Sequence, residues 1–207
     1  MDISKTHEES RLPVTKADGN PDGKGAHGFL VDWSTTEPRG VVAKPRRQLL
    51  AEFFTSMLVL SASIRYRPAP GCSNYLYWID GQWSLSLIAP HEWSHERRAG
   101  FAGTCVLQHD MTWTIAPSQQ LTEDGPAAHA IRRSYDAFAE MLDTDLTLEE
   151  ILPSYDSGLS YYQRLYGGAL RRSVYAAVAR GDQGSQSCRQ WRMQLPHLNT
   201  MLLVHRD

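Results

Sequence analysis

The chain is poor in cysteine and has no long apolar run. Its 207 residues include three cysteines, Cys72, Cys105 and Cys188, which are far apart and form no Cys-x-x-Cys pair. Neither a disulfide framework nor a cysteine-ligated zinc site is therefore indicated, and a reducing cytoplasm is the expected compartment. The most apolar stretch, residues 49–64, contains Glu52 and is shorter than the roughly 20 residues of a membrane helix, so no membrane contact is expected.

An excess of charge of one sign is also missing. The net charge is −2, which excludes a global electrostatic attraction to nucleic acid or to a membrane surface. Charge is nevertheless uneven, because residues 119–156 hold nine acidic residues against two arginines, and residues 157–207 hold seven arginines against two aspartates. We expect these blocks to be solvated faces that pair with each other, with a partner-binding face as the alternative.

The fingerprints of several common enzyme classes are absent as well. The chain has no P-loop, no G-x-G-x-x-G and no G-x-S-x-G, so neither a nucleotide-binding loop nor a serine hydrolase elbow is indicated. Tyrosines and arginines interleave after residue 160, a pattern that can stack on nucleic acid and neutralise it. With so little net charge we favour tyrosines packed inward and arginines outward, and nucleic acid is not an expected partner.

The clearest pattern that is present predicts a β-hairpin. Residues 75–79 and 82–88 flank Asp80-Gly81, a dipeptide typical of a type I′ turn. A two-residue loop fixes the register, so Trp78 is predicted to pair with Trp83. Because strand side chains alternate, one face is expected to be buried, and it carries Leu76, Trp78, Trp83, Leu85 and Leu87. The opposite face is amphipathic and carries Tyr75, Tyr77, Ile79, Gln82, Ser84 and Ser86.

The remaining periodicity predicts an α+β fold. A helix is expected over residues 46–62, and a second hairpin over 101–108 and 111–115. The four strands are predicted to form a small antiparallel β-meander, which can curl like an SH3-type sheet, packed with helices. Further helices are expected over 126–142, after Thr147 with Glu150 in a capping box, and over 159–180, where Gly167-Gly168 is a candidate break.

The expected organisation has three parts. They are a flexible N-terminal arm of residues 1–27, a core of helix plus antiparallel sheet over 28–118, and a mainly helical extension over 119–207 that packs on the core. Within them, residues 28–33 are interpreted as a short strand or docking segment, 63–67 as a short strand, and 191–204 as either a strand or a helix.

One run of residues resembles a known family. The matching positions are Pro70-Gly71, Tyr75-Leu76-Tyr77, Gly81, Leu85-Ser86-Leu87-Ile88, Pro90, Glu92-Trp93, Gly103, Leu107-Gln108-His109-Asp110 and Thr112-Trp113. Over about residues 44–116 this order is similar to the uncharacterised domain-of-unknown-function family 2452. The resemblance implies a fold and brings no activity or catalytic residue. It also implies that Glu92-Trp93 is the recurring pair, since the family usually has no histidine at the position of His91 and a glycine at that of Ser94.

The segment His91-Glu92-Trp93-Ser94-His95 reads as H-E-x-x-H. On a helix this pattern places two imidazoles on one metal and a glutamate on its water. One hypothesis is therefore a zinc-dependent hydrolase with His91 and His95 as ligands, Glu92 as general base, and His109 or Asp110 as third ligand. A non-catalytic metal cluster of His91, His95 and His109 is a further alternative.

We favour a structural corner at this segment over the metal site. Pro90 precedes His91, and Gly100 ends any helix quickly, so the motif has little helix on either side. In the corner, Glu92 is expected to bind backbone amides or an arginine such as Arg97 or Arg98, while Trp93 packs into the core.

The function predicted from these patterns is a cytoplasmic, non-catalytic interaction module. Its binding residues are expected to be Tyr75, Tyr77, Ser84 and Ser86, since tyrosine beside serine on a sheet suits an extended peptide. A protein or peptide is the expected partner, and no cofactor is expected outside the zinc alternative. The oligomeric state stays open.

Overall fold

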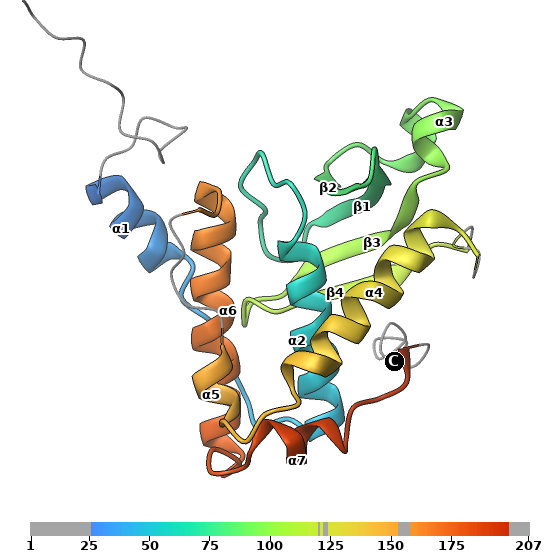
Figure 1. Cartoon of the computed structure of the whole chain (residues 1–207). Coiled ribbons are helices and arrows are strands. Elements are labelled where there is room, and N and C mark those ends of the chain that lie inside the picture. Colours follow the sequence, from blue (N-terminus) through green and yellow to red (C-terminus); the bar gives the residue numbers. More distant parts are fainter. Residues whose placement is uncertain (1–25, 120, 122–123, 153–157, 199–207) are drawn as a thin grey trace, which may run out of the picture.

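The structure, a computed structural model, describes residues 26–119, 121, 124–152 and 158–198 (Figure 1). Within them, an antiparallel sheet and its helices confirm the α+β prediction. The strands are β1 (Ser73–Ile79), β2 (Gln82–Ser86), β3 (Phe101–Leu107) and β4 (Trp113–Pro117). The helices are α1 (Ala26–Thr35), α2 (Arg46–Leu60), α3 (His95–Arg98), α4 (Pro126–Met141), α5 (Leu148–Ile151), α6 (Tyr161–Arg180) and α7 (Cys188–Arg192), with a short 3₁₀ turn at Pro90–Glu92. Most of the predicted N-terminal arm lies outside the described residues.

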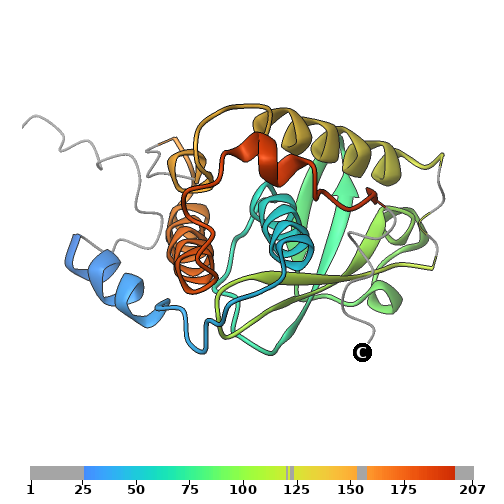
Figure 2. The same ribbon diagram turned by 90° about the horizontal axis from the view of Figure 1, so that it is seen from below.

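Helix α2 is the centre of the molecule and matches the predicted helix closely. It starts directly after Pro45, and Leu50 and Phe53 are fully buried. Figure 2 looks along the helix and shows the sheet on one side of it, with α4, α6 and α7 on the others. A helix covered on several sides is apolar around most of its circumference, which explains the wide apolar stripe of this segment.

The β1–β2 hairpin has the predicted register. Trp78 pairs with Trp83, and Ile79 pairs with Gln82. The turn residues Asp80 and Gly81 have positive φ angles of 50° and 76°, as a type I′ turn requires. The dipeptide therefore sets which side chains of the hairpin face the core.

The strand order β2-β1-β3-β4 differs from the predicted meander. In a meander β3 would lie beside β2, whereas here it pairs with β1. Ser63 occupies the outer edge of β2, since its N–H donates to the carbonyl of Trp83 (2.9 Å) and its carbonyl accepts from the N–H of Leu85 (3.2 Å). The chain between β2 and β3 therefore crosses to the other side of β1.

Most of the predicted core face of the hairpin is buried. Leu76, Trp83 and Leu85 are buried, and Trp78 is half-buried. The prediction was wrong for Leu87, which is 59% exposed. Strand β2 ends at Ser86, so the alternation of side chains does not continue to Leu87.

The short strand expected over 63–67 is absent, and of the two interpretations of residues 28–33, a strand or a docking segment, the strand is wrong. Residues 28–33 lie in helix α1, and of residues 63–67 only Ser63 makes a β-bridge, to Ser84. A single bridge is all that this segment adds to the sheet, because the chain leaves the edge of β2 after Ser63. The uncertain stretch 191–204 begins inside helix α7, and its last residues lie outside the described part of the chain.

Helix α6 runs without a break through Gly167-Gly168, which was a candidate kink. A Cβ on Gly168 would lie 2.2 Å from the ring of Trp33 in α1. The glycine is therefore needed for the close packing of α1 on α6 rather than for a bend. Arg172, one turn further along α6, lies with its guanidinium 4.0 Å from the centre of the same ring, a cation–π contact.

The uneven charge is partly paired within the chain. Arg189 binds Asp143 (3.1 Å) and Asp145 (2.5 Å), and Arg192 binds Asp143 (2.7 Å). These contacts join the acidic block to the start of α7, as expected for blocks that pair with each other.

Among the described helices, none combines the length and apolar character that a membrane crossing requires.

Candidate functional site

The segment after the hairpin forms a corner, which we define as residues 87–100. A carboxylate oxygen of Glu92 accepts a hydrogen bond from the N–H of Ala89 (2.8 Å), and Glu92 is otherwise exposed. The carboxylate closes the 3₁₀ turn on itself, as a residue at the third position of a capping box does. Glu92 thus binds a backbone amide, which is one of the two expected contacts for a structural corner.

Trp93 fixes the corner to the sheet. Its half-buried ring meets the ring of Tyr77 edge to face, with centroids 6.2 Å apart. The guanidinium of Arg97 lies 4.5 Å from the centre of the Trp93 ring, and Arg98 donates to the Trp93 carbonyl (3.2 Å). Both neighbouring arginines therefore hold the tryptophan, whose indole packs on β1.

The predicted binding face of the hairpin is not open at its centre. Tyr77 is fully buried beneath the corner, where its hydroxyl donates to the carbonyl of Ile88 (2.9 Å) and burial raises its pKa to about 12. Tyr75, Ser84 and Ser86 are half-buried. The sequence could not show this, because the crossing of the chain over β1 is what covers Tyr77.

The two histidines of the H-E-x-x-H segment do not share a helix face. His91 lies in the 3₁₀ turn, whereas His95 starts α3. Between them Trp93 and Ser94 have ψ angles of 156° and 157°, so the backbone is extended where the zinc motif requires helix. Within the described residues, no three histidine, cysteine or acidic side chains are placed to hold a metal ion.

Asp110, the other candidate metal ligand, belongs to a buried group of three charges that we call the Lys44 triad. The ammonium of Lys44 donates to Asp110 (2.6 Å) and to Glu52, which is 3% exposed. Asp110 also accepts from the N–H (3.1 Å) and hydroxyl (2.7 Å) of Thr112. Burial acts to raise the pKa of Asp110, but these hydrogen bonds outweigh it and hold the pKa below its usual value. His109 adjoins Asp110 in the β3–β4 loop, at the opposite end of β3 from the corner.

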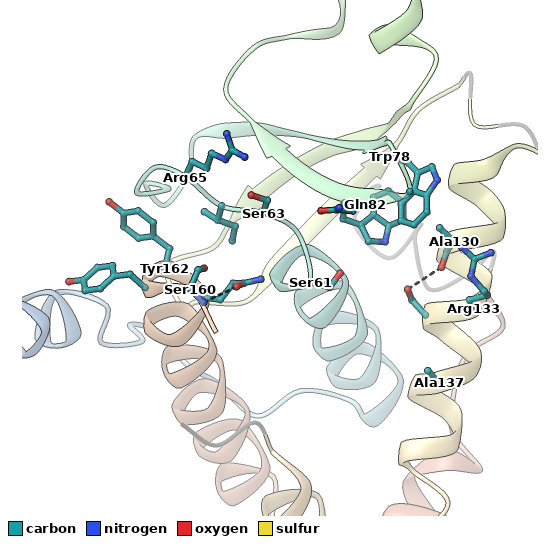
Figure 3. Close-up of a pocket in the computed structure, with 16 residues that line it drawn as sticks. Ser61, Ser63, Arg65, Trp78, Gln82, Ala130, Arg133, Ala137, Ser160 and Tyr162 are labelled. Atoms are coloured by element: carbon teal, nitrogen blue, oxygen red, sulfur yellow. Dashed lines mark hydrogen bonds between the residues drawn. The ribbon is translucent and has the colours of Figure 1, made fainter. Parts of the chain in front are cut away.

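The described residues form a cleft of about 850 Å³ between the hairpin tip, α4 and the start of α6 (Figure 3). Four separate segments supply its walls, and none of the predicted binding residues is among them. The lining residues are Ser61, Ser63, Ile64, Arg65, Trp78, Gly81, Gln82, Trp83, Ala130, Arg133, Ser134, Ala137, Ser160, Tyr161, Tyr162 and Gln163.

The base of the cleft is the place where the end of α2 meets the start of α6. The amide nitrogen of Gln163 donates to the carbonyls of Leu60 (3.1 Å) and Ala62 (3.2 Å). Its amide oxygen accepts from the N–H of Ser160 (3.1 Å). The Gln163 side chain thus gives hydrogen-bond partners to backbone carbonyls at the end of α2 and to a backbone N–H at the start of α6. Such groups at helix ends lack partners within their own helix, so Gln163 joins the two helices at the base of the cleft.

The charge in the cleft is of one sign. Arg65 and Arg133 are exposed, and no aspartate or glutamate is found among the described residues that line it. The guanidinium of Arg133 lies 5.9 Å from the ring centre of Trp78, and the Trp78 ring is edge-on to that of Trp83, with centroids 4.8 Å apart. Serine and glutamine side chains supply neutral hydrogen-bonding groups between the two cations.

Sequence reasoning missed the cleft because its walls are far apart along the chain. The alternation of the hairpin predicts Trp78 in the core, and no local pattern singles out Arg133. The available signal was a tryptophan at a hairpin tip, where one edge of the ring has to meet solvent. Which helix lies opposite that ring depends on the packing of α4, and local patterns do not contain this information.

Comparison with known proteins gives one match. Residues 42–132 match the family described as Protein of unknown function (DUF2452), which confirms the resemblance noted for about residues 44–116. The matched segment contains the corner, the Lys44 triad and Arg65, but not Arg133 or the start of α6. Searches of curated proteins and of solved structures found no match.

Proposed function

We propose that this chain is a non-catalytic binding module, and that its ligand binds in the cleft between the hairpin tip, α4 and the start of α6. The observation that carries the proposal is a single concave surface with two arginines and no acidic residue among its described lining. Its volume of about 850 Å³ is within the range of about 300–1,000 Å³ typical of ligand sites.

The composition of the cleft supports recognition of an anionic ligand. Guanidinium groups bind carboxylates and phosphates through paired, charge-assisted hydrogen bonds. Tyrosine, tryptophan and serine together are typical of surfaces that bind by contact area and adaptable hydrogen bonding. Arg65 and Arg133 would supply the charge, and Trp78 and Tyr162 the contact area.

The same lining favours binding over catalysis. Its described residues include no histidine, cysteine, lysine or carboxylate, so tyrosine is the one usual proton-transfer group among them. Its serines lack a neighbouring base of the kind that activates a hydroxyl nucleophile.

The free thiols of Cys72, Cys105 and Cys188 support the cytoplasm as the compartment in which the module works.

A dye experiment tests the site. Anilinonaphthalene sulfonate, an aromatic anion, is expected to fluoresce on binding the full chain at one site. Arg133→Glu should weaken that binding by about tenfold, because it replaces an attractive charge with a repulsive one. Arg132→Glu is the matched control, since Arg132 is exposed on the same helix and is not in the lining. Equal effects of the two variants would contradict the cleft as the binding site.

A further inference from the structure

Some of the polar side chains of the cleft are free to bind a ligand. Within the described residues, the side chains of Ser63, Arg65, Gln82 and Arg133 make no hydrogen bond or ion pair, and the guanidinium of Arg133 lies over the ring of Trp78. By contrast, Ser134 donates to the carbonyl of Ala130 (3.0 Å) within its own helix. The unused groups are therefore concentrated on the β2 edge and on the two arginines.

The two arginines stand on different sides of the cleft. Figure 3 shows Arg65 and Tyr162 on the side of α6, and Arg133 on α4, with Ser61 and Ser63 between them. A ligand that contacts both cations has to carry two anionic groups that are separated from each other. An extended peptide meets this requirement, since it rises about 3.3 Å per residue and can place an acidic side chain at either end.

The aromatic rings of the cleft are a poor platform for a nucleobase. Arg133 already lies over the Trp78 ring, and the ring of Tyr162 is edge-on to that of Tyr161, with centroids 5.3 Å apart. The chain also lacks the glycine-rich loop that usually cradles phosphates. Both observations favour a peptide over a nucleotide as the source of the negative charge.

The position of β2 in the sheet supports the same ligand. As the first strand in the order β2-β1-β3-β4, it has no strand on its outer edge among the described residues, but Ser63 already bonds there to the carbonyl of Trp83 and the N–H of Leu85. An extended chain can therefore reach this edge only beyond Ser63, where side-chain contacts add specificity. Gln82 and the hairpin tip lie just beyond the bridge, at the mouth of the cleft.

We infer that the occupant of the cleft is an extended segment of a partner protein that carries two separated acidic side chains. One carboxylate binds Arg65 and the other binds Arg133, while Ser63 and Gln82 bond to the peptide backbone between them. This inference rests on the proposed function, because it names the ligand class of the same cleft. It commits to an acidic peptide on the basis of charge complementarity.

Fluorescence anisotropy with labelled peptides tests the inference. The probes are short glycine- and serine-rich peptides with two glutamates at several spacings, together with versions in which both are glutamine. We expect one glutamate spacing to bind best and its glutamine version to bind at least about tenfold more weakly. Arg65→Glu and Arg133→Glu should each weaken binding of the glutamate peptide by a similar factor, and Arg132→Glu should leave it unchanged.

A charge exchange makes the test independent of any loss of folding. Replacing one glutamate of the best peptide by lysine should restore part of the binding to Arg133→Glu, which a misfolded variant cannot do. Equal binding of glutamate and glutamine peptides, or equal losses in Arg132→Glu and Arg133→Glu, would overturn the inference. Binding of ATP that is lost in Arg133→Glu, without any peptide binding, would also overturn it and yet leave the cleft as the site of an anionic ligand.

Discussion

At the residue scale, we expect Trp93 to stabilise the corner and His91 to contribute little. The indole packs against Tyr77 and Arg97, and Arg98 bonds to the Trp93 carbonyl, whereas the imidazole of His91 is exposed and makes no hydrogen bond or ion pair with the described residues. Trp93→Ala should lower the free energy of unfolding by about 2 kcal/mol, less than for a fully buried tryptophan because the ring is half-buried. His91→Ala should change it by less than about 0.5 kcal/mol.

Urea denaturation of the two variants measures this difference. A loss in His91→Ala that equals or exceeds the loss in Trp93→Ala would contradict a structural corner. It would also favour the alternative in which His91 and His95 bind a metal ion.

The Lys44 triad makes stability depend on pH at both ends of the scale. In the folded state the pKa of Asp110 is lowered below its ordinary value of 3.8. The ionised carboxylate therefore stabilises the fold above pH 3.8, and this stabilisation is lost as the pH falls through the lowered, folded-state pKa. The pKa of Lys44 is raised from 10.5; burial acts to lower it, but hydrogen bonds to Asp110 and Glu52 outweigh burial. The charged ammonium of Lys44 therefore stabilises the fold below pH 10.5, and this stabilisation is lost as the pH rises through the raised, folded-state pKa.

The test is the pH dependence of the free energy of unfolding in Asp110→Asn. Below pH 3.8 the wild type should lose stability more steeply than the variant, which lacks the titrating group. Asp136→Asn, an exposed position on α4, is the control and should follow the wild type. Identical acid slopes for all three proteins would show that the triad does not control acid stability.

At the scale of elements, two adjacent glycines of α6 have opposite roles. A Cβ on Gly168 would collide with the Trp33 ring at 2.2 Å, whereas nothing lies within 4 Å of the corresponding position at Gly167. Alanine is favoured over glycine in a helix by about 1 kcal/mol. Gly167→Ala should therefore stabilise the protein slightly, while Gly168→Ala should push α1 off α6.

Limited proteolysis within α1 and the fluorescence of Trp33 distinguish the two variants. We expect faster cleavage and a red-shifted tryptophan emission for Gly168→Ala, and neither change for Gly167→Ala. Equal behaviour of the two alanine variants would mean that the close contact with Trp33 does not hold α1.

At the scale of the whole molecule, the C-terminal helices complete the core around α2. The ring of Phe53 packs on Phe138 (5.3 Å between centroids), and that of Phe54 packs on Tyr135 (5.8 Å) and Phe138 (5.5 Å). We therefore predict that a fragment ending at residue 118 does not fold cooperatively, because it exposes the apolar side of α2. Near-ultraviolet circular dichroism of the fragment measures this, and a native-like spectrum with a sharp thermal transition would contradict it.

The features that were predictable from sequence are those set by neighbours along the chain. Asp80-Gly81 determined the hairpin register, Thr147 and Glu150 marked the start of α5, and the apolar stripe after Pro45 located α2. The position of β3 and the burial of Tyr77 were not predictable, because both depend on where the chain crosses the sheet after β2. The cleft was missed for the same reason, since α4 and the hairpin tip meet only in the folded chain.

The order of the cleft's walls along the chain also has a consequence for protein synthesis. Its last wall, residues 160–163, is made after the hairpin, α2 and α4. A chain still emerging from the ribosome, which folds from its N-terminal end, has no complete cleft until residues 160–163 have been translated. A ligand of the proposed site is therefore expected to bind only those nascent chains in which this last wall has been made and has packed against the others.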